Sequence, residues 1–389
     1  MQGRNGRHFL QIPGPTNVPD RILKAMSRPV IDHRGPDFQA LASSVLARVK
    51  PVFKTSGPVV IYPSSGTGAW EASLVNTLSP RDRILMFETG QFAVLWREVA
   101  QRLGLDVQFV AGDWRHGASP DEAEKILAAD TAHKIKAVCV VHNETSTGVA
   151  SRIGEIRAAI DHVGHPALLL VDTVSSLGSI DFRHDEWRVD VTVSCSQKGL
   201  MLPPGLGLNA ISAKAIEASK SAKSARSYWD WGPMLKMNAD GFFPFTPVTS
   251  LLYALDEALT MLAEEGLDNV FARHDRLAAA TRAAVSAWGL DNLCLDPREY
   301  SSVLTAVVMP GGTGADGLRK LILEHFNMSL GAGLGKMQDR IFRIGHLGEL
   351  SELTLLGALC GVEMGLGLAG VPFKKGGVDA AMAHFAAKT

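Results

Sequence analysis

Lys198 is the residue whose setting most directly suggests chemistry. It follows the short apolar run Val191–Cys195, which is typical of a buried β-strand, and small residues stand beside it. Burial in such a place lowers the pKa of a lysine, so that the neutral amine can act as a nucleophile. On its own, however, a lysine at this position is more often a solvated surface residue. Other residues must therefore decide between the two interpretations.

Asp172 stands in a comparable place, directly after the apolar run Ala167–Val171. The carboxyl ends of strands are where open α/β sheets bind their ligands. An acid there can hold a ring nitrogen protonated, as a pyridine-based electron sink requires. A helix cap or a structural ion pair would explain the same residue equally well.

A third feature is the small-residue segment Ser64–Gly68, which follows the apolar run Val59–Tyr62 and opens a helix near Trp70. Backbone N–H groups at a helix start favour an anion, and Ser65 and Thr67 add hydroxyl donors. As an isolated feature, the segment is better explained as a plain turn between a strand and a helix. Together and in this order, the three features match the phosphate, the ring nitrogen and the aldehyde of pyridoxal phosphate.

The elements that would position these groups are short, apolar, mostly β-branched runs separated by helical patterns. Such runs are typical of strands buried on both faces of a parallel sheet. The seven runs are Val59–Tyr62, Ile84–Phe87, Val107–Val110, Ala137–Val141, Ala167–Val171, Val191–Cys195 and Leu208–Ile211. Between two of them, Ser119 and Glu122 form a capping box that opens a helix toward Ala129. The alternation predicts an α/β fold with a mostly parallel seven-stranded sheet between helices.

The pattern changes after about residue 249, where long helices and only a few strands follow. The predicted helices are Ser250–Glu264, Leu267–Ala287, Ala315–Phe326 and, as the final one, Leu350–Met364. The predicted strands are Val303–Met309 and Phe342–Ile344. We therefore expect an N-terminal arm over residues 1–20, a large domain over 21–255 and a smaller α+β domain over 256–389.

Composition and charge restrict the class of protein. Hydrophobic residues make up 46% and charged residues 20%, which is an ordinary globular balance. The net charge of −1 gives no electrostatic support for a nucleic-acid or membrane partner. We expect neither a signal peptide nor a membrane-spanning helix, and no metal, because the histidines lack zinc-type spacing. The scattered cysteines favour a reducing, cytoplasmic compartment, and they are Cys139, Cys195, Cys294 and Cys360.

Six motifs, spread from about residue 10 to about residue 365, carry a family resemblance. They are Pro13–Val18, Ser65–Glu71, Asn143–Gly148, Val171–Gly178, Ser196–Gly205 and Arg343–Gly348. In these motifs the chain resembles the class V aminotransferases of fold type I, in the branch that holds serine–glyoxylate and alanine–glyoxylate aminotransferases.

The resemblance implies a role for each matching residue. Lys198 would hold pyridoxal phosphate as a Schiff base and move the proton between the substrate Cα and the cofactor. Asp172 would pair with the ring nitrogen, and Arg343 would bind the substrate α-carboxylate with its planar fork. The remaining implied cofactor contacts are Ser65, Gly66 and Thr67 at the phosphate, Gln197 beside the lysine, Thr145 near the ring hydroxyl, and Val174 and Phe92 on the two ring faces.

Other residues match the family less directly. Thr246 resembles a residue that reaches the phosphate from the partner subunit, which implies a homodimer with shared active sites; pairing of dimers into tetramers stays open. His33 and Arg34 lie in a polar turn that relatives bring toward the substrate opening, and a structural role in the turn fits them equally well. For His346, a hydrogen-bonded, partly buried histidine is the favoured interpretation.

The resemblance implies transfer of an amino group from L-serine to glyoxylate, which gives hydroxypyruvate and glycine. A glyoxylate aminotransferase that uses alanine or aspartate is the alternative, and aspartate would need a second cation, for which His33 or Arg34 is the candidate. A desulfurase-like lyase would need a cysteine in a mobile loop, whereas Cys294 lies in an apolar run. A non-enzymatic binding protein would not need the acid, the lysine and the arginine together.

Overall fold

The larger of two main sheets contains all seven strands predicted from the sequence. The computed structural model describes residues 7–387, so residues 1–6 of the predicted N-terminal arm lie outside the described part. The strands are β2 (Val59–Pro63), β3 (Arg83–Phe87), β4 (Asp106–Val110), β5 (Ile135–Val141), β8 (Leu168–Asp172), β9 (Val191–Cys195) and β10 (Leu206–Ile211). Their order is β2-β10-β9-β8-β5-β3-β4. Only β10 runs antiparallel to its neighbours, so the prediction of a mostly parallel sheet is confirmed.

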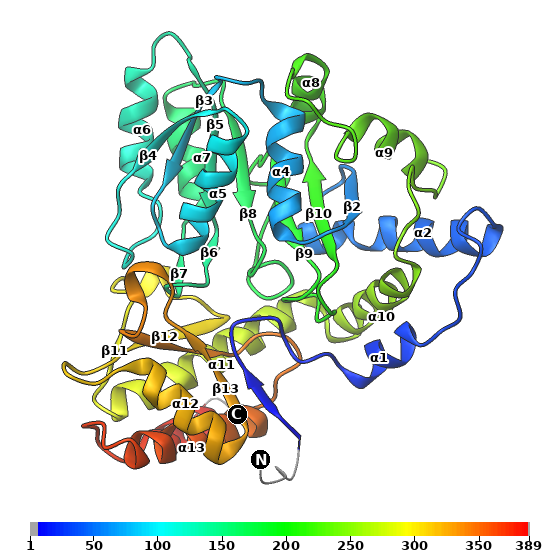
Figure 1. Ribbon diagram of the computed structural model, residues 1–389. Coiled ribbons are helices and arrows are strands. Elements are labelled where there is room, and N and C mark those ends of the chain that lie inside the picture. Colours follow the sequence, from blue (N-terminus) through cyan, green and yellow to red (C-terminus); the bar gives the residue numbers. More distant parts are fainter. Residues whose placement is uncertain (1–6, 388–389) are drawn as a thin grey trace.

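Helices cover both faces of this sheet (Figure 1). The covering helices include α4 (Gly66–Thr77), α5 (Gln91–Arg102), α6 (Pro120–Ala129) and α7 (Ile153–His162). Ile84 and Leu170 share one hydrophobic core with α4 and α5, whereas their chain neighbours Leu85 and Leu169 share another with α6 and α7. Because successive strand residues point to opposite faces, an uninterrupted apolar run is what a sheet covered on both sides requires.

A second, five-stranded sheet lies at the lower end of the molecule in Figure 1. Its strands are β1 (Phe9–Gln11), β11 (Asp291–Asn292), β12 (Leu304–Val308), β13 (Met328–Ala332) and β14 (Ile341–Gly345). Their order is β1-β13-β14-β12-β11, and β1 pairs with β13 in parallel. The helices around this sheet are α11 (Leu267–Ala287), α12 (Ala315–Phe326), α13 (Glu352–Leu368) and α14 (Gly377–Ala386). The predicted N-terminal arm thus supplies an edge strand to a sheet formed by the C-terminal part of the chain.

The remaining elements connect and flank the two sheets. They are α1 (Asp20–Met26), α2 (Pro36–Arg48), α3 (Lys50–Phe53), β6 (Asn143–Glu144), β7 (Val149–Ala150), α8 (Ala213–Ser221), α9 (Trp231–Asn238) and α10 (Thr249–Glu265), with short 3-10 turns at Pro297–Glu299 and Gly335–Met337. The predicted boundary between residues 255 and 256 falls inside α10, whose apolar side packs with the larger core. The division into domains at that residue stays a prediction.

Two expectations about local structure have definite outcomes. The capping box is confirmed, because the Ser119 hydroxyl accepts the N–H of Glu122 at 3.2 Å at the start of α6. The expectation that the helix near Leu350–Met364 is the final one is wrong, because α14 follows it. The Glu363 carboxylate accepts the N–H groups of Gly376 and Val378, which fixes the start of α14 through a contact made by the preceding helix.

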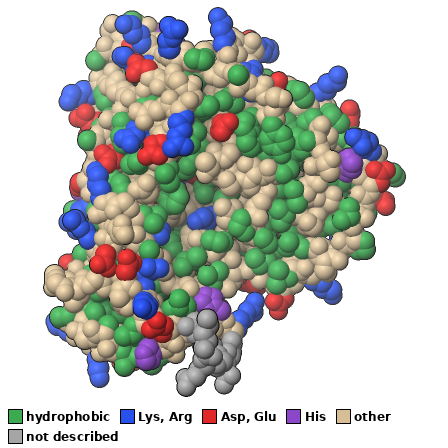
Figure 2. Space-filling model, in the orientation of Figure 1, with side chains coloured by type: hydrophobic (Ala, Val, Ile, Leu, Met, Phe, Trp, Pro, Cys, Tyr) green, Lys and Arg blue, Asp and Glu red, His purple; other side chains and the backbone are tan. Residues whose placement is uncertain are grey.

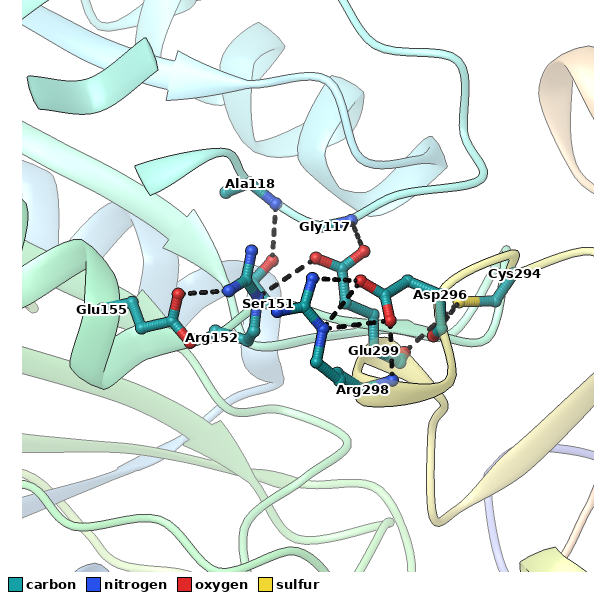
Figure 3. A network of polar contacts seen from close by, with 9 residues as sticks. All are labelled: Gly117, Ala118, Ser151, Arg152, Glu155, Cys294, Asp296, Arg298 and Glu299. Atoms are coloured by element: carbon teal, nitrogen blue, oxygen red, sulfur yellow. Dashed lines mark hydrogen bonds and ion pairs between the residues drawn. The ribbon is translucent and has the colours of Figure 1, made fainter. Parts of the chain in front are cut away.

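A network of polar contacts joins the turn at Pro297–Glu299 to loops of the larger sheet (Figure 3). The Glu299 side chain accepts the N–H of Gly117 at 2.8 Å and the Nε–H of Arg152 at 3.3 Å. In the same network Asp296 accepts hydrogen bonds from Arg298. These contacts fix the two sheets against each other close to the carboxyl end of β5. Within residues 7–387, no helix is long and apolar enough to cross a membrane.

Candidate active site

A cavity of about 160 Å³ lies where β8 and β9 end, at the carboxyl edge of the larger sheet. Nine of the residues predicted to bind the cofactor line it together. These are Ser65, Gly66, Thr67, Phe92, Thr145, Asp172, Val174, Gln197 and Lys198. They come from five separate segments of the chain, and the parallel strand order brings those segments to one edge.

Lys198 is buried, with 9% of its surface exposed, and therefore is not the solvated lysine that its type alone would favour. Its Nζ donates a hydrogen bond to the backbone oxygen of Pro13 at 2.7 Å. Gly14 packs so closely on this side chain that a Cβ at Gly14 would lie 2.4 Å from Nζ. Burial lowers the pKa of the Lys198 amine. The amine therefore loses its proton more readily than a surface lysine, as a nucleophile must.

The Asp172 carboxylate is held by one donor on each oxygen. The backbone N–H of Val174 donates to Oδ1 at 2.6 Å, and the indole N–H of Trp70 donates to Oδ2 at 3.0 Å. The pKa of Asp172 is raised to about 7, mainly by burial and also by nearby Glu144, while the two hydrogen bonds act in the opposite direction. A protonated ring nitrogen close to this carboxyl group would restore its charged form.

The segment around Gly66 forms the rim of the cavity at the start of α4. The first bond of the helix runs from the N–H of Ala69 to the oxygen of Ser65, so the N–H groups before Ala69 face outward from the helix end. A Cβ at Gly66 would lie 2.6 Å from a methyl group of Val174, so only glycine allows this close approach. Outward N–H groups at the positive end of a twelve-residue helix suit a phosphate.

Apolar side chains line two sides of the cavity between Asp172 and Lys198. Val174 comes from the turn after β8, and Phe92 comes from the start of α5. The Glu144 carboxylate accepts the N–H of Phe92 at 3.1 Å, which fixes the first turn of that helix. Among the described residues, the buried Oδ1 of Asn143 has no partner and belongs to a side chain that lines the cavity. An anion cradle, a strand-end acid, a buried amine and two apolar walls fit pyridoxal phosphate.

Arg343 approaches the cavity from β14 of the smaller sheet. Its Nη1 donates to the backbone oxygen of Thr145 at 2.6 Å, and its Nε donates to the oxygen of Ala332 at 2.7 Å. Burial lowers the pKa of Arg343 to about 10, which still leaves the guanidinium charged at neutral pH. A fixed cation beside a buried amine suits a substrate that carries a carboxylate.

Four predicted site residues do not line this cavity. Arg343 lies behind its lining and is bonded to the lining residue Thr145. Thr246 is exposed in the segment between α9 and α10, and His33 and Arg34 lie in the turn before α2. His346 is fully buried and bonded at both ring nitrogens, to the Ser302 oxygen and to the Thr305 hydroxyl, each at 3.0 Å. The favoured interpretation of His346 as a hydrogen-bonded histidine is therefore confirmed, although it is fully rather than partly buried.

Cys294 also lies outside the cavity and is buried. Its Sγ is 3.5 Å from the backbone oxygen of Glu299, within the network of Figure 3. Burial raises the pKa of its thiol to about 12, which opposes formation of a nucleophilic thiolate.

Several residues at the site were not singled out from the sequence, namely the lining residues Pro15, Trp70, Asn143 and Ser175, and Pro13, which accepts the Lys198 bond. Trp70, Asn143 and Ser175 stand inside the quoted motifs that also hold Ser65, Thr145 and Asp172, and Pro13 and Pro15 belong to the first motif. Their position in these motifs was the available signal, but a proline carbonyl or an indole has no chemical pattern of its own that predicts such contacts.

Comparisons with known proteins agree with this geometry. A family model described as Aminotransferase class-V matches residues 8–334. The chain is 49% identical to serine–glyoxylate aminotransferase of Methylorubrum extorquens, over 98% of this chain and 96% of that protein. It is 45% identical to L-aspartate–glyoxylate aminotransferase of Paracoccus denitrificans, over 96% of this chain and 95% of that protein.

A solved structure gives the same result for the fold. Pyridoxamine–pyruvate aminotransferase from Mesorhizobium loti matches with a TM-score of 0.92 and 27% identity, over 98% of this chain and 97% of that chain. Sheet order, cavity and sequence thus agree over nearly the whole length. The chain therefore belongs to the class V aminotransferase family, the pyridoxal-phosphate-dependent transaminases of fold type I.

Proposed function

We propose that this enzyme transfers an amino group from L-serine to glyoxylate, giving hydroxypyruvate and glycine. The serine–glyoxylate aminotransferase that is 49% identical over nearly the whole chain supports this choice of substrates. The observation that carries the proposal is the position of Arg343, bonded to the cavity residue Thr145 beside the buried amine of Lys198. Both substrates and both products carry a carboxylate next to the reacting carbon, which this guanidinium would bind and orient.

Each residue of the cavity would then contribute one property. Bound pyridoxal phosphate supplies an electron sink for the Cα–H bond of the substrate. The Lys198 amine would bind the aldehyde of the cofactor. Once the substrate amine has taken its place there, the freed Lys198 amine would carry the proton that leaves Cα. Asp172 would keep the ring nitrogen protonated, and the start of α4 at Gly66 would hold the phosphate. Val174 and Phe92 would exclude water from the two ring faces.

Aspartate as the amino donor is the second candidate, because a relative named for it is 45% identical. A side-chain carboxylate would need a second cation close to Lys198. His33 and Arg34 are the candidates from the sequence, and neither lines the cavity within one chain. Serine needs only a small polar pocket, so this geometry favours serine, with alanine as the smallest alternative donor.

Steady-state rates with glyoxylate as acceptor test this choice. We expect kcat/KM to be highest for L-serine, lower for L-alanine and lowest for L-aspartate, because neither His33 nor Arg34 lines the cavity. A half-reaction without glyoxylate, followed by the loss of the visible cofactor band, separates donor binding from the acceptor step. A higher kcat/KM for L-aspartate than for L-serine would overturn the proposed donor.

The homodimer with shared active sites is part of this proposal. Its support is the exposed position of Thr246, which the family resemblance places at a partner's phosphate, and the 43% exposure of Tyr228 in the segment that leads to α9. Figure 2 shows hydrophobic side chains gathered over the middle and right of this face, with charged groups mostly along the margins. Light scattering should give twice the mass of one chain for the active enzyme; an active monomer would contradict shared sites.

A cytoplasmic location completes the proposal. It is supported by the cysteines, which are free in the structure and scattered along the chain. Fractionation of cells that produce the natural protein would test it, with activity expected in the cytoplasmic fraction.

A further inference from the structure

Trp70 links two ends of the cofactor site through one helix. It stands one turn after Gly66 in α4, so the helix that begins at the proposed phosphate cradle also carries the indole that reaches Asp172. Trp70 is 3% exposed, and its ring stacks on that of Trp96 with centroids 5.9 Å apart and planes 13° apart. A side chain fixed in this way cannot follow the carboxylate, so it must orient the carboxylate instead.

We propose that Trp70 is a positioning residue, whose indole N–H keeps the Asp172 carboxylate charged and aimed at the ring nitrogen of pyridoxal phosphate. This inference rests on the proposed role of Asp172 at that nitrogen. The indole is a donor only, so it can stabilise the carboxylate but not a protonated oxygen at the same position. It thereby favours the arrangement in which the proton stays on the ring nitrogen, where the electron sink needs it.

The surroundings of Asp172 show why such a donor is needed. Burial and the neighbouring Glu144 both act against the charged form of this acid. The N–H of Val174 bonds one oxygen, and without Trp70 the other oxygen would keep no donor among its described hydrogen bonds. A buried carboxylate with an unpaired oxygen loses stabilisation that water cannot replace.

The matched test compares Trp70→Phe with Trp96→Phe. Both changes replace a buried, stacked indole by a smaller ring, and among the described residues the Trp96 Nε1 has no hydrogen-bond partner. Only Trp70→Phe removes the donor to Asp172. The readout is the NMR shift of isotope-labelled ring nitrogen in cofactor bound to each protein, with Asp172→Asn as the reference for lost protonation.

We expect the ring nitrogen to be protonated in the parent enzyme and in Trp96→Phe, and to move toward the Asp172→Asn value in Trp70→Phe. The dissociation constant of pyridoxal phosphate should rise about tenfold in Trp70→Phe, as expected for a lost hydrogen bond to a charged group. Should Trp70→Phe fail to fold, benzothienylalanine at position 70 keeps the bicyclic ring without the N–H and gives the same comparison.

The possible outcomes distinguish the proposed role of Asp172 from the proposed role of Trp70. An unprotonated ring nitrogen in the parent enzyme would refute the proposed role of Asp172 itself. A protonated nitrogen in the parent, with equal shifts and equal cofactor affinities in Trp70→Phe and Trp96→Phe, would overturn only the inference about Trp70.

Discussion

Two charged regions of this molecule differ in how their charges are balanced. In the network of Figure 3, Asp296 is hydrogen-bonded to Arg298, and this pairing lowers the pKa of Asp296 to about 2. In the cavity, burial dominates instead: it raises the pKa of Asp172 to about 7 and lowers that of Lys198. Asp296 in the network is thus held in its charged form, whereas Asp172 and Lys198 in the cavity are shifted toward neutrality.

This difference indicates which of the two regions can do chemistry. A paired charge contributes to structure and titrates far from neutral pH, whereas an incompletely paired buried group can gain or lose a proton during a reaction. The cavity thus contains an acid, Asp172, and an amine, that of Lys198, which can pair with the ring nitrogen and the aldehyde of pyridoxal phosphate.

The largest expected effect comes from Lys198→Ala. Loss of the amine should lower kcat by at least about a hundredfold, the lower end of what a general acid–base group contributes. Transamination rates with saturating pyridoxal phosphate measure it. The control is Lys220→Ala, a change at an exposed lysine of α8 that should leave the rate close to that of the parent. Equal rates in the two variants would remove Lys198 from the chemistry.

Arg343→Lys is expected to have the next largest effect. The variant keeps a positive charge but loses the planar fork, so kcat/KM should fall about tenfold to a hundredfold for both the amino and the keto substrate. Arg282→Lys is the control, because Arg282 is also largely removed from solvent but donates to the oxygen of Ser301, which does not line the cavity. A fall for only one of the two substrates would contradict a shared carboxylate site.

Asp172→Asn tests the raised pKa of the cavity acid in the cofactor-free protein. The folded pKa of Asp172, about 7, lies above its ordinary value of 3.8, so the folded protein keeps a proton that the unfolded chain releases. The free energy of unfolding of the parent therefore falls as pH rises through this window. Removing the carboxyl group should stabilise the variant relative to the parent by a few kcal/mol at about pH 8 and by much less at about pH 5. Urea unfolding at both pH values measures the difference; a constant difference would show that Asp172 is not shifted.

The smallest effects are expected in the network. Glu299 is 4% exposed, and Glu299→Ala leaves the N–H of Gly117 and the Arg152 guanidinium without this partner. The free energy of unfolding should fall by about 1–3 kcal/mol. Glu155→Ala removes an exposed partner of the same Arg152 and should cost at most about 1 kcal/mol. Substrate affinity should change little in both variants. A lower transamination rate under conditions where the variant is still fully folded would give the network a catalytic role.

Much of the larger sheet and its site could be predicted because the signals are local. A strand buried on both faces is an uninterrupted apolar run; Asp172 follows such a run directly, and Lys198 follows another after Ser196 and Gln197. The hydrogen bond from Trp70 to Asp172 and the contact of Lys198 with Pro13 join residues far apart in the chain. No local pattern encodes such contacts, because the strand order creates them.

The smaller sheet was less predictable for the same physical reason. The strand β13 pairs with β1, which joins the N-terminal segment to a strand near the other end of the chain. The helix α14 is rich in small residues, and its start depends on the Glu363 carboxylate of α13. Thr246, His33 and Arg34 lie outside the cavity of one chain, and their roles stay predictions.

The central claim is that Lys198 carries pyridoxal phosphate. Reduction of the purified enzyme with borohydride, followed by proteolysis and mass spectrometry, fixes the cofactor to whichever amine holds it. The account predicts a phosphopyridoxyl group on the peptide that contains Lys198 and on no other lysine peptide. A modified lysine elsewhere in the chain, or an unmodified Lys198 in an active preparation, would contradict it.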